Sequence, residues 1–366
     1  MQVSSLRKIN SIFLLGFASI ASLYYAATFF IPLTVAIFLA MLLAPMTNKL
    51  ELKGIGKVWA PAISTLVVFI LVSALTYLFV VQMQGFIKDL PGLQGSVDAI
   101  SEKARTFLSK QTSISQQQQQ QYLDKYYARI TINIENKLTA FVGMLLNTTI
   151  YFVIVLVYTY LLLLKRHKYK EFVLMLFPSK DKEKVEDITE KTTNVAFQYL
   201  WGRLKVMLII GTMHYLAFRA FDLKHVIVLT IFVSIVAVIP YIGSIVSSSI
   251  PFLLYILNEH NLLLILSFGA VLILIQLIES YLVEPIIIGS EMHLSALTIL
   301  LCIMAGDLIW GIAGMLLFIP MVAIVKILFD HVENLNPFAF LLGDTRSPVK
   351  AITFNSIVAF FKKRKK

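Results

Sequence analysis

The sequence predicts an all-α polytopic membrane protein with about seven or eight transmembrane helices, two of them helix–break–helix segments, plus an extracytoplasmic helical hairpin. Hydrophobic residues make up 58% of the 366 residues and charged residues only 14%, whereas soluble domains average about 45–50% and about 25%. The apolar residues gather in charge-free runs long enough to cross about 30 Å of hydrocarbon. This composition excludes a disordered chain, an ordinary cytosolic enzyme and, with the single Cys302, a disulfide-rich secreted scaffold.

Residues 1–83 are expected to hold three membrane helices. A proline, Pro32, interrupts the first charge-free stretch, which indicates two short helices in place of one long one. The three helices are expected at Ser11–Phe29, Ile31–Met46 and Val58–Ile87. The apolar stretch continues well past any cleavage site, so we expect an uncleaved first helix and not a signal peptide.

Two polar parts separate the remaining apolar runs. Residues 84–137 contain two amphipathic stretches around the Gln-rich Gln116–Gln121, which predicts an extracytoplasmic helical hairpin. The apolar faces of this hairpin either pack on each other or another subunit, or lie on the membrane. We expect residues 138–164 to form the fourth membrane helix and 165–200 a cytoplasmic amphipathic segment. A membrane transport core at 201–332 and a basic cytoplasmic tail at 333–366 complete the chain.

The net charge of +11 is interpreted as a signal of orientation. The basic clusters are Arg7 and Lys8; Lys49, Lys53 and Lys57; Lys165, Arg166, Lys168 and Lys170; and Lys362–Lys366. All four can lie on one side if the first two helices form a hairpin and the third and fourth bracket an outside loop, which places both termini in the cytoplasm. The partner predicted from this charge is the lipid bilayer. Nucleic acid is not expected, because no folded basic domain is available to bind it.

Two apolar segments are interrupted by Pro or Gly. Their arms are Val226–Ile239 and Ser244–Leu257 around Pro240–Gly243, and Leu294–Ala305 and Ile312–Val325 around Gly306–Gly311. Each arm is too short for an untilted crossing. Irregular backbone at membrane depth persists only where it is buried in protein or lines a cavity. Paired interruptions of this kind therefore indicate a transporter's binding site.

Ionisable residues are scarce in the apolar runs. Glu279 and Glu284 either face a wet cavity or meet water at the end of a helix. For Asp307, which follows a glycine, we favour a turn residue at the tip of a hairpin over a pathway residue. His214 is expected to make an inter-helix hydrogen bond more than to relay protons. The sequence contains no phosphate-binding loop, metal-ligand spacing or catalytic constellation, so neither an enzyme nor a cofactor is expected.

The chain resembles the autoinducer-2 exporter family of bacterial inner-membrane proteins, also called PerM-like permeases. The resemblance rests on Tyr199–Arg203 (Tyr-Leu-Trp-Gly-Arg), Ile239–Gly243 (Ile-Pro-Tyr-Ile-Gly), Glu279, Leu282–Pro285, Ile288–Gly289, Gly311–Met315 and Ile319–Pro320. It implies an outside domain between the third and fourth helices and transport without ATP. Family members are associated with export of autoinducer-2, and others are similar to Na⁺/H⁺ antiporters.

We therefore expect a multi-pass permease or exporter of a small polar solute in the bacterial inner membrane, driven by an ion gradient. The predicted pathway residues are Arg203, Pro240, Tyr241, Gly243, Gln276, Glu279, Glu284, Pro285 and Asp307. A Na⁺(Li⁺)/H⁺ antiporter using the same acids, with a monovalent cation as its substrate, is the first alternative. A membrane scaffold for an envelope protein is the second. Assembly into a homo-oligomer is a further possibility, which the sequence supports only through the amphipathic hairpin.

Overall fold

The computed structural model describes residues 2–89, 139–140, 142–143, 151–175, 182–239, 242–259, 261–287, 294–332 and 335–344. Within these ranges the chain is helical apart from short turns and one isolated bridge between Leu294 and Gly343. The prediction of an all-α protein is confirmed for this part of the chain. The predicted extracytoplasmic hairpin lies outside the described residues from residue 90 onward, as does the tail from residue 345.

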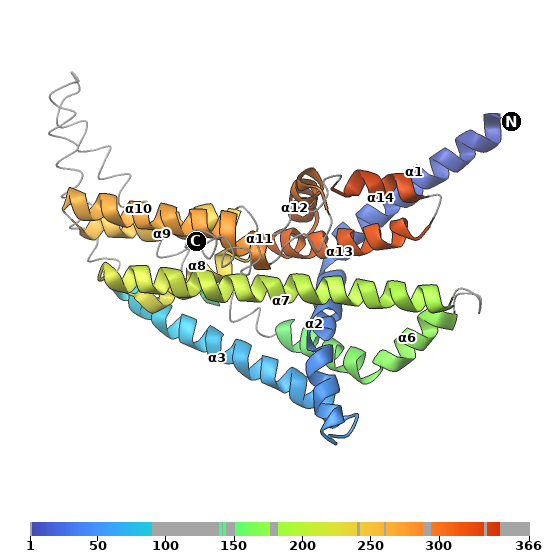
Figure 1. The fold of residues 1–366 in the computed structure, drawn as a ribbon, viewed down its shortest axis with the longest axis horizontal. Coiled ribbons are helices and arrows are strands. Elements are labelled where there is room, and N and C mark those ends of the chain that lie inside the picture. The colour runs from blue at the N-terminus through green and yellow to red at the C-terminus, as the bar shows by residue number, and fades with distance from the viewer. Residues whose placement is uncertain are drawn as a thin grey trace, which may run out of the picture.

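Figure 1 shows the helices in their order along the chain. They are α1 (Gln2–Tyr25), α2 (Ala27–Leu52), α3 (Trp59–Asp89), the helical segment Tyr151–Leu164, α6 (Arg166–Met175), α7 (Lys182–Ala220), α8 (Val226–Val236), α9 (Ile242–Asn258), α10 (Leu262–Ile278), the π-helical turn η3 (Glu279–Val283), α11 (Glu284–Ile287), α12 (Ala296–Trp310), α13 (Ile312–Asp330) and α14 (Asn336–Leu342).

Four helices of the described chain are long and apolar enough to cross a membrane: α2, α3, the continuous Leu262–Ile287 and α13. Shorter apolar helices, such as Tyr151–Leu164, α8 and α12, accompany them. The described chain therefore has the helices of an integral membrane protein, with four that are capable of crossing a bilayer by length and composition. The total of seven or eight spans stays a prediction.

The break between the first two helices lies at Ala26, and the predicted break at Pro32 is wrong. Pro32 and Pro45 both lie inside α2. A proline removes one hydrogen bond and clashes with the preceding turn, but it does not always end a helix. In a membrane, neighbouring helices can satisfy the freed carbonyl, and the apolar run of α2 continues through both prolines.

Helix α7 is a long helix that runs through the middle of the structure (Figure 1). Its 39 residues give a length of about 58 Å at about 1.5 Å per residue. It runs without interruption past residues 200 and 201, where the predicted cytoplasmic segment meets the predicted transport core. Helices α2, α8, α10, α11 and α13 all pack against it. This one helix, polar in its first part and apolar in its second, therefore provides the surface on which N-terminal and C-terminal helices of the described chain pack.

The larger apolar core lies around the C-terminal part of α7. Phe218 and Phe268 are fully buried there, and Val233, Tyr255 and Phe79 join them from α8, α9 and α3. The Tyr255 and Phe268 rings are 4.5 Å apart between centroids. Aromatic burial of this kind contributes the largest areas in a core, and here it fixes the C-terminal ends of α3, α7 and α9 together.

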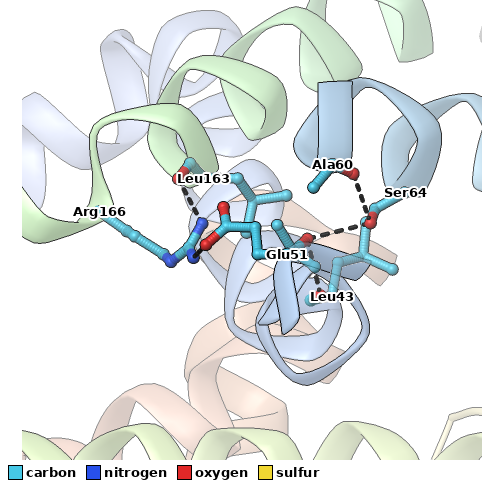
Figure 2. Close-up of polar contacts among 7 residues, drawn as sticks. Leu43, Glu51, Ala60, Ser64, Leu163 and Arg166 are labelled. Atoms are coloured by element: carbon cyan, nitrogen blue, oxygen red, sulfur yellow. Dashed lines mark hydrogen bonds and ion pairs between the residues drawn. The ribbon is translucent and has the colours of Figure 1, made fainter. Parts of the chain in front are cut away.

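A second set of contacts fastens α2 to α3 and to the chain around residue 165 (Figure 2). Arg166 Nη2 donates to Glu51 Oε2 at 2.6 Å, and Arg166 Nη1 donates to the Leu163 carbonyl at 3.2 Å. The hydroxyl oxygens of Thr47 and Ser64 lie 3.0 Å apart, and both residues are fully buried. Each hydroxyl also reaches a carbonyl one turn earlier in its own helix, so no polar atom here is left unpaired in the apolar interior.

The first predicted helix–break–helix segment is confirmed. Helix α8 ends at Val236, and α9 begins at Ile242 after an interruption. Gly243 is buried and its N–H donates to the Ile239 carbonyl at 2.9 Å. A Cβ on Gly243 would lie 2.2 Å from the Val236 carbonyl oxygen, which no side chain tolerates. The glycine therefore permits α9 to start directly against the end of α8.

The second break is confirmed in kind but is shorter than predicted. Only Gly311, with φ of +59°, separates α12 from α13. Gly306 and Asp307 are helical, so the expected turn at Asp307 is wrong. Gly306 instead faces Gly314 across the two helices, where a Cβ on Gly314 would lie 2.0 Å from the Gly306 carbonyl oxygen. This glycine serves close helix packing.

Candidate functional site

The centre of the candidate site is an ion pair between α7 and α11. Arg203 Nη1 donates to Glu284 Oε1 at 2.8 Å. The Arg203 side chain is 9% exposed and that of Glu284 31%. Two predicted pathway residues from distant parts of the sequence are thus in direct contact. Helix α7 supplies the guanidinium from its buried face, and α11 supplies the carboxylate from its first residue.

A second carboxylate lies beside this pair. Glu279 begins η3, a π-helical turn between α10 and α11, and is only 4% exposed. It lies within electrostatic range of both Glu284 and Arg203. A π-helical turn adds one residue to the helical ladder and is frequent at functional sites. The buried positions of this helix up to Glu279 are Phe268, Leu272, Ile275 and Glu279, at spacings of four, three and four. Glu279 therefore continues the inward face of α10, and the site holds two acids and one arginine.

The fourth member of the cluster is Tyr199, which the sequence analysis did not propose as a site residue. It lies one turn before Arg203 on α7, and the Arg203 guanidinium carbon is 5.8 Å from the centre of its ring. The Tyr199 hydroxyl donates to the Leu316 carbonyl of α13 at 3.3 Å. The i, i+4 spacing of Tyr199 and Arg203 was the available signal, because it places both side chains on one helix face. Tyr199 thereby connects the charged cluster to α13.

One donor in the cluster remains unused. Arg203 Nε is buried and has no hydrogen-bond partner within the described chain. A buried donor without an acceptor costs about 1–3 kcal/mol, and such groups often mark a place that a water or solute occupies. The guanidinium therefore binds Glu284 on one side and presents a free N–H on another.

The remaining predicted residues lie around this cluster or away from it. Gln276 is half-buried on α10, one turn before Glu279, and Pro285 is exposed directly after Glu284. Asp307 is exposed on α12 and makes no hydrogen bond or ion pair with Arg203 or Glu284. Gly243 lies at the α8–α9 break, as described above. Pro240 and Tyr241 fall outside the described residues.

His214 is a buried residue of α7 with a local partner. Its Nδ1 donates to the Ile210 carbonyl at 2.9 Å, within the same helix, so the expected inter-helix hydrogen bond is not formed by this atom. Its ring packs edge-on against Phe218. Across the residues that the structure describes, no group of three His, Cys, Asp or Glu side chains is placed to hold a metal ion. Cys302 is buried in the apolar cluster that includes Tyr199.

Comparison with known proteins decides the family. The family model described as AI-2E family transporter matches residues 12–334, which is most of the chain. The chain belongs to the AI-2E transporter family. The resemblance drawn from the sequence motifs is confirmed.

Relatives in this family align over most of their own length. The AI-2 transport protein TqsA of Escherichia coli (strain K12) is 24% identical over 324 residues, covering 87% of this chain and 91% of TqsA. PerM of the same organism, named provisionally as a permease, is 25% identical over 84% of this chain and 89% of PerM. YueF of Bacillus subtilis (strain 168), named provisionally as a transport protein, is 22% identical over 85% and 86%.

The region matched by the AI-2E model includes the whole charged cluster. Tyr199, Arg203, Glu279 and Glu284 all lie between its first and last matched residues. The AI-2E family is a family of transport proteins, so the cluster lies in the part of the chain that this transporter family shares.

Proposed function

We propose that this chain is a permease that moves a small polar solute across the membrane without ATP. The observation that carries the proposal is the largely buried Arg203–Glu284 ion pair, beside Glu279 at the π-helical turn of the Leu262–Ile287 helix, in a member of a transporter family. Charged residues within membrane spans are costly and face a bundle interior or a water-filled cavity. Three of them in one place support a polar route between α7 and the α10–η3–α11 helix.

The chemistry of the cluster suits a solute with oxygen atoms. Arg203 Nε offers a donor that no described residue accepts, and the two carboxylates offer acceptors. Charges away from water interact more strongly than charges in water, so these groups can hold a solute that takes the place of part of the ion pair. The ion pair re-forms when the solute leaves. Because TqsA is named for transport of AI-2, autoinducer-2 is the first solute to examine, with export as the proposed direction.

Proteoliposomes loaded with autoinducer-2 test the proposal. Vesicles with wild-type protein are expected to release the solute faster than equally loaded liposomes without protein, and faster still under an imposed proton or sodium gradient. Glu284→Gln is expected to abolish the difference. Asp330→Asn is the matched control, since it removes a carboxylate from the exposed Lys326–Asp330 pair at 2.7 Å. Release by Glu284→Gln at the wild-type rate would refute the assignment of the cluster.

A Na⁺(Li⁺)/H⁺ antiporter is a second candidate, favoured by one observation. Glu279 is buried and makes no ion pair with another described residue, and an unpaired intramembrane carboxylate is suited to carrying a proton or a small cation. Addition of sodium or lithium to vesicles with an acidic interior would then release protons from the lumen. Glu279→Gln would remove that release, while an unchanged internal pH in wild-type vesicles would reject this candidate.

We also propose that both termini face the cytoplasm of the bacterial inner membrane. The Glu51–Arg166 ion pair supports this orientation, because it brings the basic turn after α2 and the basic residues after Leu164 to the same side of the protein. Lysine and arginine concentrate on the cytoplasmic side. A cysteine introduced at Lys57 should be protected from a membrane-impermeant thiol reagent in intact cells. Rapid labelling would show that this side of the protein faces outward and would contradict the proposed orientation.

A further inference from the structure

A cavity of about 600 Å³ lies at the C-terminal end of α7. It is surrounded by the end of α3, the turn between α7 and α8, and the end of α9, which gather at one side of the structure (Figure 1). Its lining residues are Phe86, Lys88, Asp89, Phe221, Asp222, Leu223, Lys224, His225, Leu229, Leu254, Tyr255, Asn258 and Glu259. The volume is typical of a pocket for a small molecule.

This cavity is separate from the charged cluster. Phe221 follows α7 directly, eighteen positions after Arg203, which corresponds to about 27 Å along a helix of about 1.5 Å rise per residue. No residue of the charged cluster lines the cavity. The structure thus places a second polar region at the C-terminal end of the same helix.

The base of the cavity is aromatic and firmly held. The rings of Phe221 and Tyr255 meet edge to face, 5.8 Å apart between centroids. Both pack on Phe268, which is fully buried in the larger core. Aromatic rings fixed in this way present a flat apolar surface at low entropic cost. They can hold the C–H face of a solute.

The rim is charged, but with no large excess of either sign. Lys88 and Lys224 line it together with the carboxylates of Asp89, Asp222 and Glu259. Asp89 Oδ2 lies 3.0 Å from a ring nitrogen of His225, and Glu259 Oε1 accepts from the Asn261 N–H at 2.9 Å. An ion of either sign therefore gains little net attraction. A neutral solute with both donors and acceptors can use both kinds of rim group.

The rim is also held in an unusual backbone conformation. Asp222 and His225, neither of them glycine, both have positive φ, at 50° and 56°. Such conformations persist where the surrounding structure enforces them, and they cluster at ligand sites. The His225–Asp89 contact fixes this turn to α3, so the opening of the cavity is preorganised.

We propose that this cavity is a solute site for a small, uncharged, polyhydroxylated molecule, acting as a vestibule at the C-terminal end of α7, apart from the Arg203–Glu284 pair. The proposal rests on the proposed function for its role in transport. Its binding step stands on the cavity alone, because the aromatic base, the balanced rim and the fixed turn require no transport cycle.

Saturation-transfer NMR on the purified full-length protein, with ribose as the probe, tests the site. Ribose should give a signal, whereas choline and acetate, single ions of similar size, should give much less. Leu254→Trp fills the cavity and should weaken ribose binding by about tenfold, equivalent to about 1.4 kcal/mol. Leu253→Trp is the matched control, because Leu253, the residue before Leu254 on α9, points outward and is 59% exposed. It should bind ribose as the wild type does.

A second variant covers misfolding of Leu254→Trp. Asp222→Asn removes a rim charge and keeps a residue type that tolerates positive φ, so it should fold and weaken ribose binding severalfold. Equal ribose signals in wild type, Leu254→Trp and Asp222→Asn would overturn the proposal, as would a stronger signal for choline or acetate. Ribose binding that responds to these variants without any vesicle flux would uphold the cavity and count against the proposed function. Flux that is unchanged by both variants, with no ribose binding, would uphold the proposed function and count against the cavity as a solute site.

Discussion

Arg203 and Glu284, 81 residues apart in the sequence, form an ion pair of 2.8 Å that joins α7 to α11. The two side chains differ in exposure, because the arginine is almost fully buried and the glutamate is about one-third exposed. Removing one partner of a buried pair leaves the other charge uncompensated. The consequence therefore depends on which partner is removed.

We predict that Glu284→Gln destabilises the protein more than Arg203→Met. The first change leaves a buried guanidinium without its carboxylate, at a cost of about 1–3 kcal/mol, whereas the second leaves a carboxylate that water can reach. The double variant should recover part of the loss. Thermal unfolding in detergent, monitored by loss of monodisperse protein, measures the order. A larger loss for Arg203→Met would contradict the described burial.

Glu279→Gln should preserve the fold and impair transport. The carboxyl is buried without an ion-pair partner among the described residues, so an amide of the same shape removes no direct salt bridge. We expect an unfolding midpoint equal to or above that of the wild type and at least about a tenfold loss of solute flux, the equivalent of about 1.4 kcal/mol in the barrier. The flux assay with Asp330→Asn as control measures this; a stable variant with full flux would remove Glu279 from the pathway.

The contact between Gly306 and Gly314 predicts a steric effect. Gly314→Ala would place a methyl group 2.0 Å from the Gly306 carbonyl oxygen, so α12 and α13 must separate, at a cost of about 1–3 kcal/mol. Gly85→Ala is the control, because nothing lies within 4 Å of its added Cβ. In a helix interior that change should stabilise by roughly 0.5–1 kcal/mol. Equal unfolding midpoints for the two variants would show that the close approach is absent.

The pair in Figure 2 should matter less than the central pair. The Glu51 and Arg166 side chains are each 20% exposed, so Glu51→Gln should cost no more than about 1 kcal/mol and less at high salt. Thr47→Val removes one hydroxyl of the buried Thr47–Ser64 contact, and Ser64 keeps its own carbonyl acceptor. Its cost should be about 0.6 kcal/mol. Unfolding in detergent at low and high salt separates the two, and a salt-independent loss for Glu51→Gln would contradict the assignment.

Local sequence signals predicted the helices well and their boundaries less well. The Pro240–Gly243 motif predicted the α8–α9 interruption because proline and glycine are residue types that interrupt helices. Pro32 misled, since a long apolar helix continues through a single lost hydrogen bond. Gly306 misled for a different reason: the glycine is required by a neighbouring helix and not by a turn.

The charged residues of the site were predicted singly, but their arrangement was not. Arg203 and Glu284 come from segments whose relative register depends on tertiary packing, so no local pattern predicts the contact. The inward direction of Glu279 follows the helical spacing of the buried Leu272 and Ile275, whereas the π-helical turn that begins at Glu279 has no signal in hydrophobic periodicity. The cavity near Tyr255 is assembled from the ends of separate helices and likewise has no sequence signal.

The most direct measurement asks whether a solute reaches the charged cluster. The sequence has one cysteine, Cys302, so Cys302→Ser gives a background for introducing a cysteine at Gln276, which is half-buried one turn before Glu279. Labelling by a small water-soluble thiol reagent is predicted to proceed and to slow when autoinducer-2 is present, while a cysteine at Asp330 is labelled at one rate throughout. A Gln276→Cys protein that is never labelled, or is labelled at the same rate with and without the solute, would contradict a solute pathway at the Arg203–Glu284 pair.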